Sequence, residues 1–378
     1  MADAFSPISI KGMVLRNRFM RSATHDGTAH ESGMVTEKSL SIYRALGEGD
    51  IGLIVSGYAF ISTSGQALKK QYGAHTDEMI ASLKKMVEAV HSKGGKIALQ
   101  IVHAGANSPY LADRGIMCLA PSRVESIGFT HREMTAGEIE AIIRDFGSAA
   151  ARAREAGFDA VQLHGAHGYL LSQFLSPLTN KRADIWGGSL ENRCRFHIEV
   201  IKEVRLQAGH DFPLLIKLGI MDDEAGGTTL AEGIAAAETM VEAGVDGIEV
   251  SAGIGGDFFR RTIGKECVPG REEPYFHERT LALKRRVSVP VALVGGIRSL
   301  QMAQRTIDTG KADIVSMSRP FIREPGLVKR WAAGDQRPAQ CITCNQCHRL
   351  LWTTDVLGNY CWQESRSKAC RPARDSAR

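Results

Sequence analysis

The sequence predicts an α/β fold, a (β/α)8 TIM barrel followed by a C-terminal cysteine-rich extension. Two observations predict the barrel. Eight short apolar runs, bounded by Gly, Asp or Pro, alternate with longer amphipathic segments. Several of these segments end at a glycine, as in SKGG, EAG and DTG, where a helix C-terminus favours Gly. Strands that alternate with helices pair in parallel through right-handed crossovers, and eight such units fit a closed barrel.

The eight expected strands are short and rich in Val, Ile and Leu, as strands buried on both faces are. They are expected at residues 18–22, 52–56, 96–102, 160–163, 214–218, 247–250, 291–294 and 314–317. Helices are expected between them, among others at 77–93, 136–156, 190–208, 230–243 and 300–309, with a short helix after the barrel at 324–333.

The alternative α/β architecture is a doubly wound sheet. Its dinucleotide-binding form carries G-x-G-x-x-G directly after the first strand. Residues 18–30 contain no such motif, and the glycine cluster at 253–256 comes too late and lacks the spacing. The barrel is therefore the preferred prediction.

Composition and charge exclude several classes of protein. With 43% hydrophobic and 24% charged residues, the 378-residue chain resembles a soluble globular protein. Lys and Arg (47) only slightly outnumber Asp and Glu (42), and without a concentrated basic patch no nucleic acid is expected as partner. The N-terminal residues lack a signal peptide and no window approaches a membrane span, so we expect a cytoplasmic protein with no membrane contact.

Three side chains that can carry chemistry follow the fourth expected strand. His164, His167 and Tyr169 lie within seven residues of the end of the apolar run FDAVQ. In a parallel α/β protein the carboxyl ends of the strands form the active site. Two imidazoles and a phenol there could bind a developing oxyanion and supply a proton. From their spacing alone, these side chains could equally satisfy backbone groups or fill a half-buried core.

The segment around these residues resembles a known family signature. HGAHGYLLSQFLSPLTNKRADIWGGSLENRCRF is similar to the Old Yellow Enzyme family, in the branch of 2,4-dienoyl-CoA reductase and trimethylamine dehydrogenase. The resemblance implies an FMN-binding barrel over residues 1–330. It implies that Ala23, Thr24 and His25 lie under the flavin ring, as the segment NRFMRSATHDG is similar to the family's first strand end.

Other flavin contacts are implied by matches at the remaining strand ends. Gln100, in LQIVHAG, would hydrogen-bond the flavin pyrimidine, and Lys217 would place a cation beside the anionic reduced flavin. Glycines after the seventh strand and an Arg after the eighth are what a barrel phosphate site needs. The complete expected cofactor set is Ala23, Thr24, His25, Tyr58, Gln100, His164, Lys217, Gly295, Gly296, Ser318 and Arg319.

Four cysteines follow the barrel with the spacing C-x2-C-x2-C-x13-C: Cys341, Cys344, Cys347 and Cys361. Four thiolates so placed could bind an iron–sulfur cluster or a structural zinc ion. The resemblance favours a [4Fe–4S] cluster, with zinc as the alternative, because the final gap is one residue longer than in trimethylamine dehydrogenase. We expect a cluster-binding extension at 331–365 and a disordered tail at 366–378.

The resemblance implies an FMN-dependent ene reductase. His164 and His167 would hydrogen-bond the carbonyl oxygen of an α,β-unsaturated substrate, and Tyr169 would protonate its α-carbon. Departures from the dienoyl-CoA reductase pattern, Asp257 in place of a catalytic His and Ala106 in place of an Arg, put the dienoyl-CoA substrate in doubt. The expected substrate contacts are Tyr58, Asp257, Phe259 and Trp352.

Two other functions stay open at this point. Tyr58, Phe259 and Trp352 could instead form an aromatic bowl for an alkylammonium group, as in trimethylamine dehydrogenase, which would imply amine oxidation. The other open function is a non-catalytic barrel that holds the flavin and the cluster and only transfers electrons. Because the multidomain relatives continue beyond this length, electrons are expected to come from NAD(P)H directly or from a partner protein. A homo-oligomer is also compatible with the resemblance.

Overall fold

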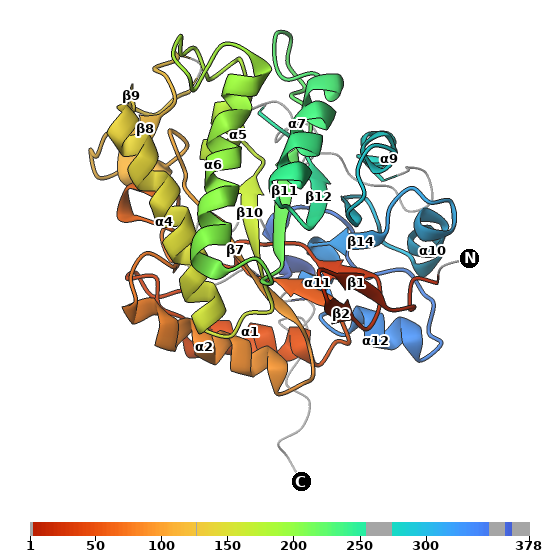
Figure 1. The fold of residues 1–378 in the computed structure, drawn as a ribbon. Helices are drawn as coiled ribbons and strands as arrows, with labels where there is room; N and C mark the ends of the chain where they lie inside the picture. Colours follow the sequence, from red (N-terminus) through yellow and green to blue (C-terminus); the bar gives the residue numbers. More distant parts are fainter. Residues whose placement is uncertain (1–2, 126, 255–273, 348–359, 365–378) are drawn as a thin grey trace.

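The computed structural model describes residues 3–125, 127–254, 274–347 and 360–364 (Figure 1). Eight parallel strands pair in chain order, and β10 pairs with β7 as well as with β11, so the sheet closes on itself. The barrel prediction is confirmed and the doubly wound sheet is wrong. The strands are β3 (Phe19–Arg21), β4 (Leu53–Val55), β7 (Ile97–Val102), β10 (Ala160–Gly165), β11 (Leu214–Gly219), β12 (Gly247–Ser251), β13 (Val291–Val294) and β14 (Ile314–Met317).

Helices surround the barrel, and their ends follow local sequence signals. Thr135 and Glu138 form a capping box at the start of α4 (Ala136–Glu155), and α6 (Leu190–Ala208) ends at Gly209 with a φ of +90°. The other helices flanking the strands are α1 (Glu37–Gly47), α2 (Glu78–His91), α7 (Leu230–Ala243), α9 (His277–Lys284), α10 (Leu300–Asp308), α11 (Arg319–Arg323) and α12 (Leu327–Ala332).

A β-hairpin closes the amino-terminal end of the barrel. Strands β1 (Ile8–Ile10) and β2 (Met13–Leu15) are antiparallel and are joined by Lys11 and Gly12, both with positive φ, as a two-residue hairpin turn requires. Its side chains Ile10, Met13 and Leu15 form one buried cluster with the lower barrel residues Met20, Leu53, Val55, Ala98, Ala160, Leu215, Ala292 and Ile314. The apolar plug leaves only the opposite end of the barrel for a site.

Additional short elements surround the opposite end, where the strands terminate. β5 (Ala59–Phe60) extends the sheet at the last residues of β7 and pairs with β6 (Tyr72–Gly73). The loop after β7 carries α3 (Pro109–Ala112) and the parallel pair β8 (Cys118–Ala120) and β9 (His131–Glu133), and the loop after β10 carries α5 (Leu170–Leu175). In the described part of the chain, no helix is long and apolar enough to cross a membrane.

Much of the segment that resembles the family signature has a structural role. The Arg182 side chain, only 6% exposed, pairs with Asp184 at 2.6 Å. Its Nη1 donates hydrogen bonds to the carbonyl oxygens of Pro121, at 3.0 Å, and Met134, at 2.8 Å. One guanidinium therefore joins the loop after α5 to the residues that directly follow β8 and β9.

We expect Arg182→Met to lower the free energy of unfolding by about 2 to 4 kcal/mol, because it leaves two carbonyl groups and a carboxylate without their donor. Urea unfolding at neutral pH measures the change. The matched control is Arg44→Met, whose ion pair with Glu37 is largely exposed and is expected to contribute less than about 1 kcal/mol. Equal losses in the two variants would contradict the structural role of Arg182.

Candidate active site at the carboxyl ends of the barrel strands

Five aromatic rings from three strand ends meet above the barrel. They form the aromatic cluster of His25, Tyr58, His164, His167 and Tyr169. Neighbouring ring centroids lie 5.3 Å apart for His25 and Tyr58, 5.6 Å for Tyr58 and Tyr169, 4.9 Å for Tyr169 and His164, and 5.1 Å for His164 and His167. The structure thus brings together all three expected catalytic residues with two expected flavin contacts.

His167 is held in a conformation that non-glycine residues rarely adopt. Its φ is +64°, and Gly168 follows with a φ of +73°. The backbone N–H of His167 donates to the carbonyl oxygen of Ala252 at 3.1 Å, and its Nε2 lies 2.7 Å from Oγ of Ser251. Contacts to the end of β12 therefore fix both the backbone and the ring, which is common where strain serves a site.

Both imidazoles of the cluster are neutral at physiological pH. Burial, together with the positive charge of Lys217, lowers the pKa of His167 to about 3. Burial lowers the pKa of His164 well below its usual value, with further contributions from His167 and Lys217. The Nδ1 atom of His164 is buried and has no hydrogen-bond partner among the described residues. Because an unpartnered buried nitrogen is costly, this atom is suited to contact a bound ligand.

The two phenols of the cluster, Tyr58 and Tyr169, lie next to each other, and Tyr169 is also a neighbour of His164. The hydroxyl of Tyr169 donates to that of Tyr58 at 3.3 Å. Burial raises the pKa of Tyr169, and burial and the neighbouring Tyr169 raise the pKa of Tyr58 well above its usual value. Both hydroxyls therefore keep their protons at neutral pH, and Tyr169 can act as a proton donor.

A polar layer lies beneath the aromatic cluster, inside the barrel. Lys217 Nζ lies 3.2 Å from Oε1 of Glu249 and donates to Oγ of Ser22 at 2.6 Å. Gln100 Nε2 donates to Oε1 of Gln162 at 2.7 Å, and Gln162 Nε2 donates to Glu249 at 3.1 Å. Two expected flavin contacts, Lys217 and Gln100, therefore belong to one connected network.

The expected phosphate residues follow two neighbouring strands, β13 and β14. Thr24 and Ser318, after β3 and β14, are joined by a hydrogen bond of 2.7 Å between their hydroxyls. Gly295 and Gly296, after β13, have φ angles of +95° and +81°, and a Cβ on Gly295 would lie 2.7 Å from the ring of Tyr275. Backbone N–H groups without side chains at such a turn suit a phosphate.

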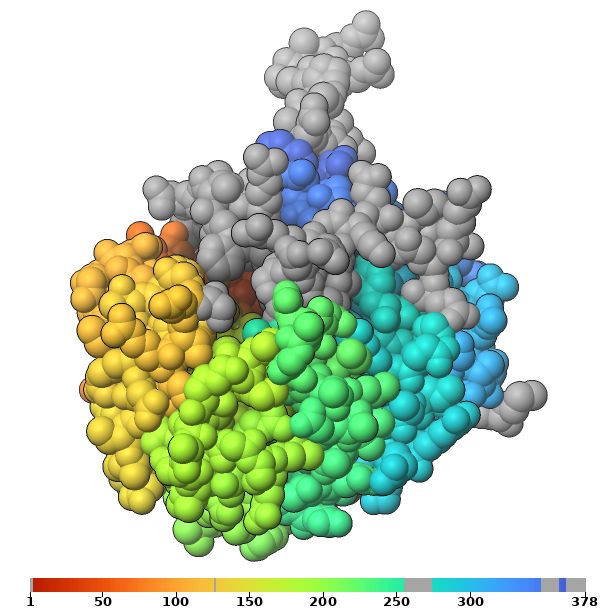
Figure 2. Space-filling view, turned by 90° about the horizontal axis from the view of Figure 1, so that it is seen from above, coloured from red at the N-terminus to blue at the C-terminus, as the bar shows by residue number. Residues whose placement is uncertain are grey.

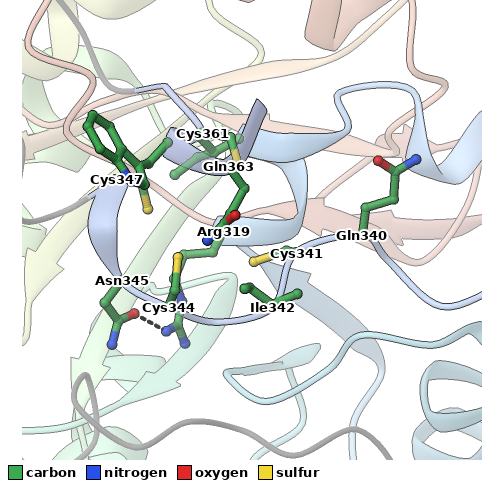
Figure 3. A pocket seen from close by; sticks show the side chains of 11 residues that line it. Arg319, Gln340, Cys341, Ile342, Cys344, Asn345, Cys347, Cys361 and Gln363 are labelled. Atoms are coloured by element: carbon green, nitrogen blue, oxygen red, sulfur yellow. Dashed lines mark hydrogen bonds between the residues drawn. The ribbon is translucent and has the colours of Figure 1, made fainter. Parts of the chain in front are cut away.

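The Arg319 guanidinium contacts the segment that carries the cysteines. It donates to Oδ1 of Asn345 and lines the cavity that the cysteines surround (Figure 3). Its assignment to a phosphate stays a prediction.

Ala23, which was expected under the flavin ring, packs beside the apolar plug of the barrel.

The four cysteines line one cavity beside α11. Cys341, Cys344, Cys347 and Cys361 share it with Arg319 and Trp362, and the Sγ of Cys361 lies 3.9 Å from Nη1 of Arg323 (Figure 3). Burial raises the pKa of Cys341, although the nearby charges of Arg319 and Arg298 oppose this effect. In the space-filling view from above (Figure 2), blue atoms of the C-terminal part of the chain are visible on the same face as green atoms of its central part. Within the described ranges, no three His, Cys, Asp or Glu side chains form a group that could hold one metal ion.

Three expected substrate contacts, Asp257, Phe259 and Trp352, lie outside the described residues and stay predictions. The site also contains residues that the sequence analysis missed, namely Ser22, Gln162, Glu249, Ser251 and Ser316. Their common signal is a polar residue inside or at the end of an otherwise apolar strand, as in AVQLHG and GIEVS.

Comparison with known proteins places the chain in a family. Residues 3–338 match the model of the NADH:flavin oxidoreductase / NADH oxidase family. The chain is 37% identical to NADH oxidase of Thermoanaerobacter brockii over 91% of this chain and 53% of that protein. It is 34% identical to NADPH dehydrogenase of Bacillus subtilis (strain 168) over 85% of this chain and 91% of that protein.

A solved structure of 2-naphthoyl-CoA reductase in complex with 2-naphthoyl-CoA superposes with a TM-score of 0.81 at 29% identity, over 92% of this chain and 54% of that one. The chain thus spans about half the length of two of these three relatives. The chain belongs to the NADH:flavin oxidoreductase / NADH oxidase family, as its resemblance to Old Yellow Enzyme sequences predicted.

Proposed function

We propose that the protein is an FMN-dependent ene reductase that takes electrons from NAD(P)H and reduces an alkene conjugated to a carbonyl group. The observation that carries the proposal is the aromatic cluster, which combines two neutral imidazoles with a protonated phenol at the mouth of the barrel. The same groups would have little purpose in a barrel that only relays electrons.

The residues at the mouth fit FMN. Lys217 and Gln100 would contact the pyrimidine end of the flavin, and Gly295, Gly296 and Ser318 would hold its phosphate. The unpartnered Nδ1 of His164 and the two consecutive glycines after β13, both with positive φ, are the features that support this fit. FMN bound here would supply a hydride to the substrate carbon after its own reduction by NAD(P)H.

The imidazoles would act on the substrate carbonyl. A neutral imidazole donates one hydrogen bond, and His164 and His167 lie together with their ring centroids 5.1 Å apart. Hydrogen bonds to the carbonyl oxygen would stabilise the negative charge that arrives there when hydride adds to the β-carbon. Because their pKa values are low, neither ring would protonate the oxygen outright.

Tyr169 would supply the proton that completes the reduction. One hydride at the β-carbon and one proton at the α-carbon together convert the C=C bond to a C–C bond. The Tyr58 hydroxyl accepts a hydrogen bond from Tyr169 and would hold the phenol in place between turnovers. A phenol of pKa about 10 or above can protonate a carbanion or enolate.

Amine oxidation is the second candidate. Its support is Tyr58, a buried aromatic ring at the mouth of the site, which could contact an alkylammonium group. Against it, the cluster contains His164 where trimethylamine dehydrogenase has a Tyr. Reduction of the flavin by an alkylamine in the absence of NAD(P)H would favour this candidate.

We propose that the cysteines bind a [4Fe–4S] cluster that exchanges electrons with the flavin or with a partner protein. Four thiols around one cavity, with Arg319 and Arg323 beside it, suit an anionic group with four sulfur ligands. A structural zinc ion is the alternative.

We expect Tyr169→Phe to bind FMN and to be reduced by NAD(P)H at the parent rate, yet to reoxidise with an enone roughly 100-fold more slowly or worse, because the proton donor is lost. Anaerobic stopped-flow absorbance separates the two half-reactions. Tyr110→Phe, on α3 outside the cluster, is the matched control and is expected to behave as the parent does. Parent-like reoxidation of Tyr169→Phe would remove Tyr169 from the acid role.

We expect Cys344→Ala to lose the iron and acid-labile sulfide while retaining the FMN, because three thiolates hold a cluster poorly and the flavin site lies in the barrel. Iron, sulfide, zinc and flavin are quantified per chain after anaerobic purification. Cys194→Ala, at a buried cysteine of α6, is the control and should keep its iron. A parent protein that contains zinc and no iron would show that the site is structural.

A further inference from the structure

We propose that Glu249 is the positioning residue of the flavin site, which holds Lys217 and, through Gln162, also Gln100, and so sets the reduction potential and the affinity of the bound flavin. The inference rests on the proposed FMN site and assigns a function to a residue that does not itself reach the mouth of the barrel.

The geometry shows one carboxylate at the centre of four hydrogen-bonding groups. Glu249 lies on β12, and its side chain is fully buried. Its Oε1 lies 3.2 Å from Nζ of Lys217 and accepts from the hydroxyl of Ser316 at 2.7 Å. Strand pairing places Glu249 directly opposite Lys217 in the β11–β12 register. Every contact comes from a different strand, so the carboxylate joins the strands at one level inside the barrel.

The other oxygen of Glu249 leads to the second flavin contact. Oε2 accepts from Nε2 of Gln162 at 3.1 Å, and Oε1 of Gln162 accepts from Nε2 of Gln100 at 2.7 Å. The acceptor role of Glu249 fixes which end of each amide donates. A carboxylate only accepts hydrogen bonds, so Gln162 must turn its NH₂ group to Glu249 and its oxygen to Gln100. This orientation leaves the oxygen of Gln100 available to a ligand.

Charge compensation is the second part of the inference. Neither Lys217 nor Glu249 is more than 5% exposed, and an isolated buried charge is strongly disfavoured. Burial tends to raise the pKa of Glu249, but Lys217 and the hydroxyls of Ser22 and Ser316 lower it overall, so the carboxylate is ionised. The ionised carboxylate partly cancels the field of Lys217 at the flavin. Without it, the cation would stabilise the anionic reduced flavin more strongly.

The first test uses Glu249→Gln, which keeps the size of the side chain and removes its charge. The reduction potential of the bound FMN, measured by anaerobic dye-equilibrated titration, is expected to shift to a more positive value than in the parent. Lys217→Met is expected to shift it to a more negative value. The double variant Lys217→Met/Glu249→Gln should match Lys217→Met alone, because the fully buried carboxylate of Glu249, once it has lost Lys217, is expected to bind a proton and become neutral.

The second test separates the two branches. Gln162→Met breaks the hydrogen-bond path to Gln100 without changing any charge. The dissociation constant of FMN, measured by flavin fluorescence, should therefore rise about 3- to 10-fold, while the reduction potential stays near that of the parent. The double variant Lys217→Met/Glu249→Gln leaves neither charge of this buried pair and is expected to fold even if Glu249→Gln alone does not. It then provides the comparison against Lys217→Met.

An unchanged potential in Glu249→Gln, or a double variant that differs from Lys217→Met, would overturn the inference while leaving the proposed function intact. A parent protein that binds no FMN would overturn both. A purely structural role for Glu249 would lower the thermal stability of Glu249→Gln and leave the potential of its bound flavin unchanged.

Discussion

A charge inside a closed barrel must be compensated inside that barrel, and the site depends on this constraint. Lys217 extends from β11 into an interior that the β1–β2 hairpin seals at the other end. Its partner, Glu249, lies on the neighbouring strand, and hydroxyl and amide groups from β10 and β14 complete the network. Once the pair is fixed, the cation has one accessible direction for further interaction, toward the mouth where the strands end.

Burial determines the protonation of the groups above this pair, and the charge of Lys217 contributes at the two imidazoles. This charge, added to burial, keeps His164 and His167 neutral, whereas burial keeps the phenols of Tyr58 and Tyr169 protonated. A mouth with one fixed cation, neutral hydrogen-bond donors and a weak acid is suited to a ligand that becomes more negative during reaction. The strained backbone of His167, held by β12, adds a geometric constraint to this electrostatic one.

Sequence patterns predicted the barrel well because its strands are buried on both faces. Such strands are short apolar runs that stand out between amphipathic helices, and the expected runs coincide with the eight observed strands to within about two residues. The aromatic cluster could also be foreseen in part, since His164, His167 and Tyr169 are close in sequence. The resemblance placed Tyr58 in the same site, but its hydrogen bond with Tyr169 could not be foreseen, because the two residues lie 111 positions apart in the chain.

The polar layer was missed for a related reason. When both faces of a strand are buried, its alternation no longer tells which side chains point inward, so Gln162 and Glu249 looked like isolated polar residues. The direction of the Arg319 side chain, toward Asn345 of the cysteine segment, depends on packing after the barrel is complete. The polar layer leaves a local signal, a polar residue in an otherwise apolar strand, whereas the direction of the Arg319 side chain leaves none.

The most direct test of the catalytic assignment is an anaerobic experiment on the purified chain with its bound flavin. NAD(P)H is added until the flavin absorbance bleaches, and a simple enone such as 2-cyclohexenone is then mixed in. If the site works as proposed, the enone restores the absorbance of the oxidised flavin and the saturated ketone appears in equal amount. If the flavin stays reduced with the enone, while trimethylamine bleaches the oxidised flavin without NAD(P)H, the proposed reduction is wrong and the site oxidises amines.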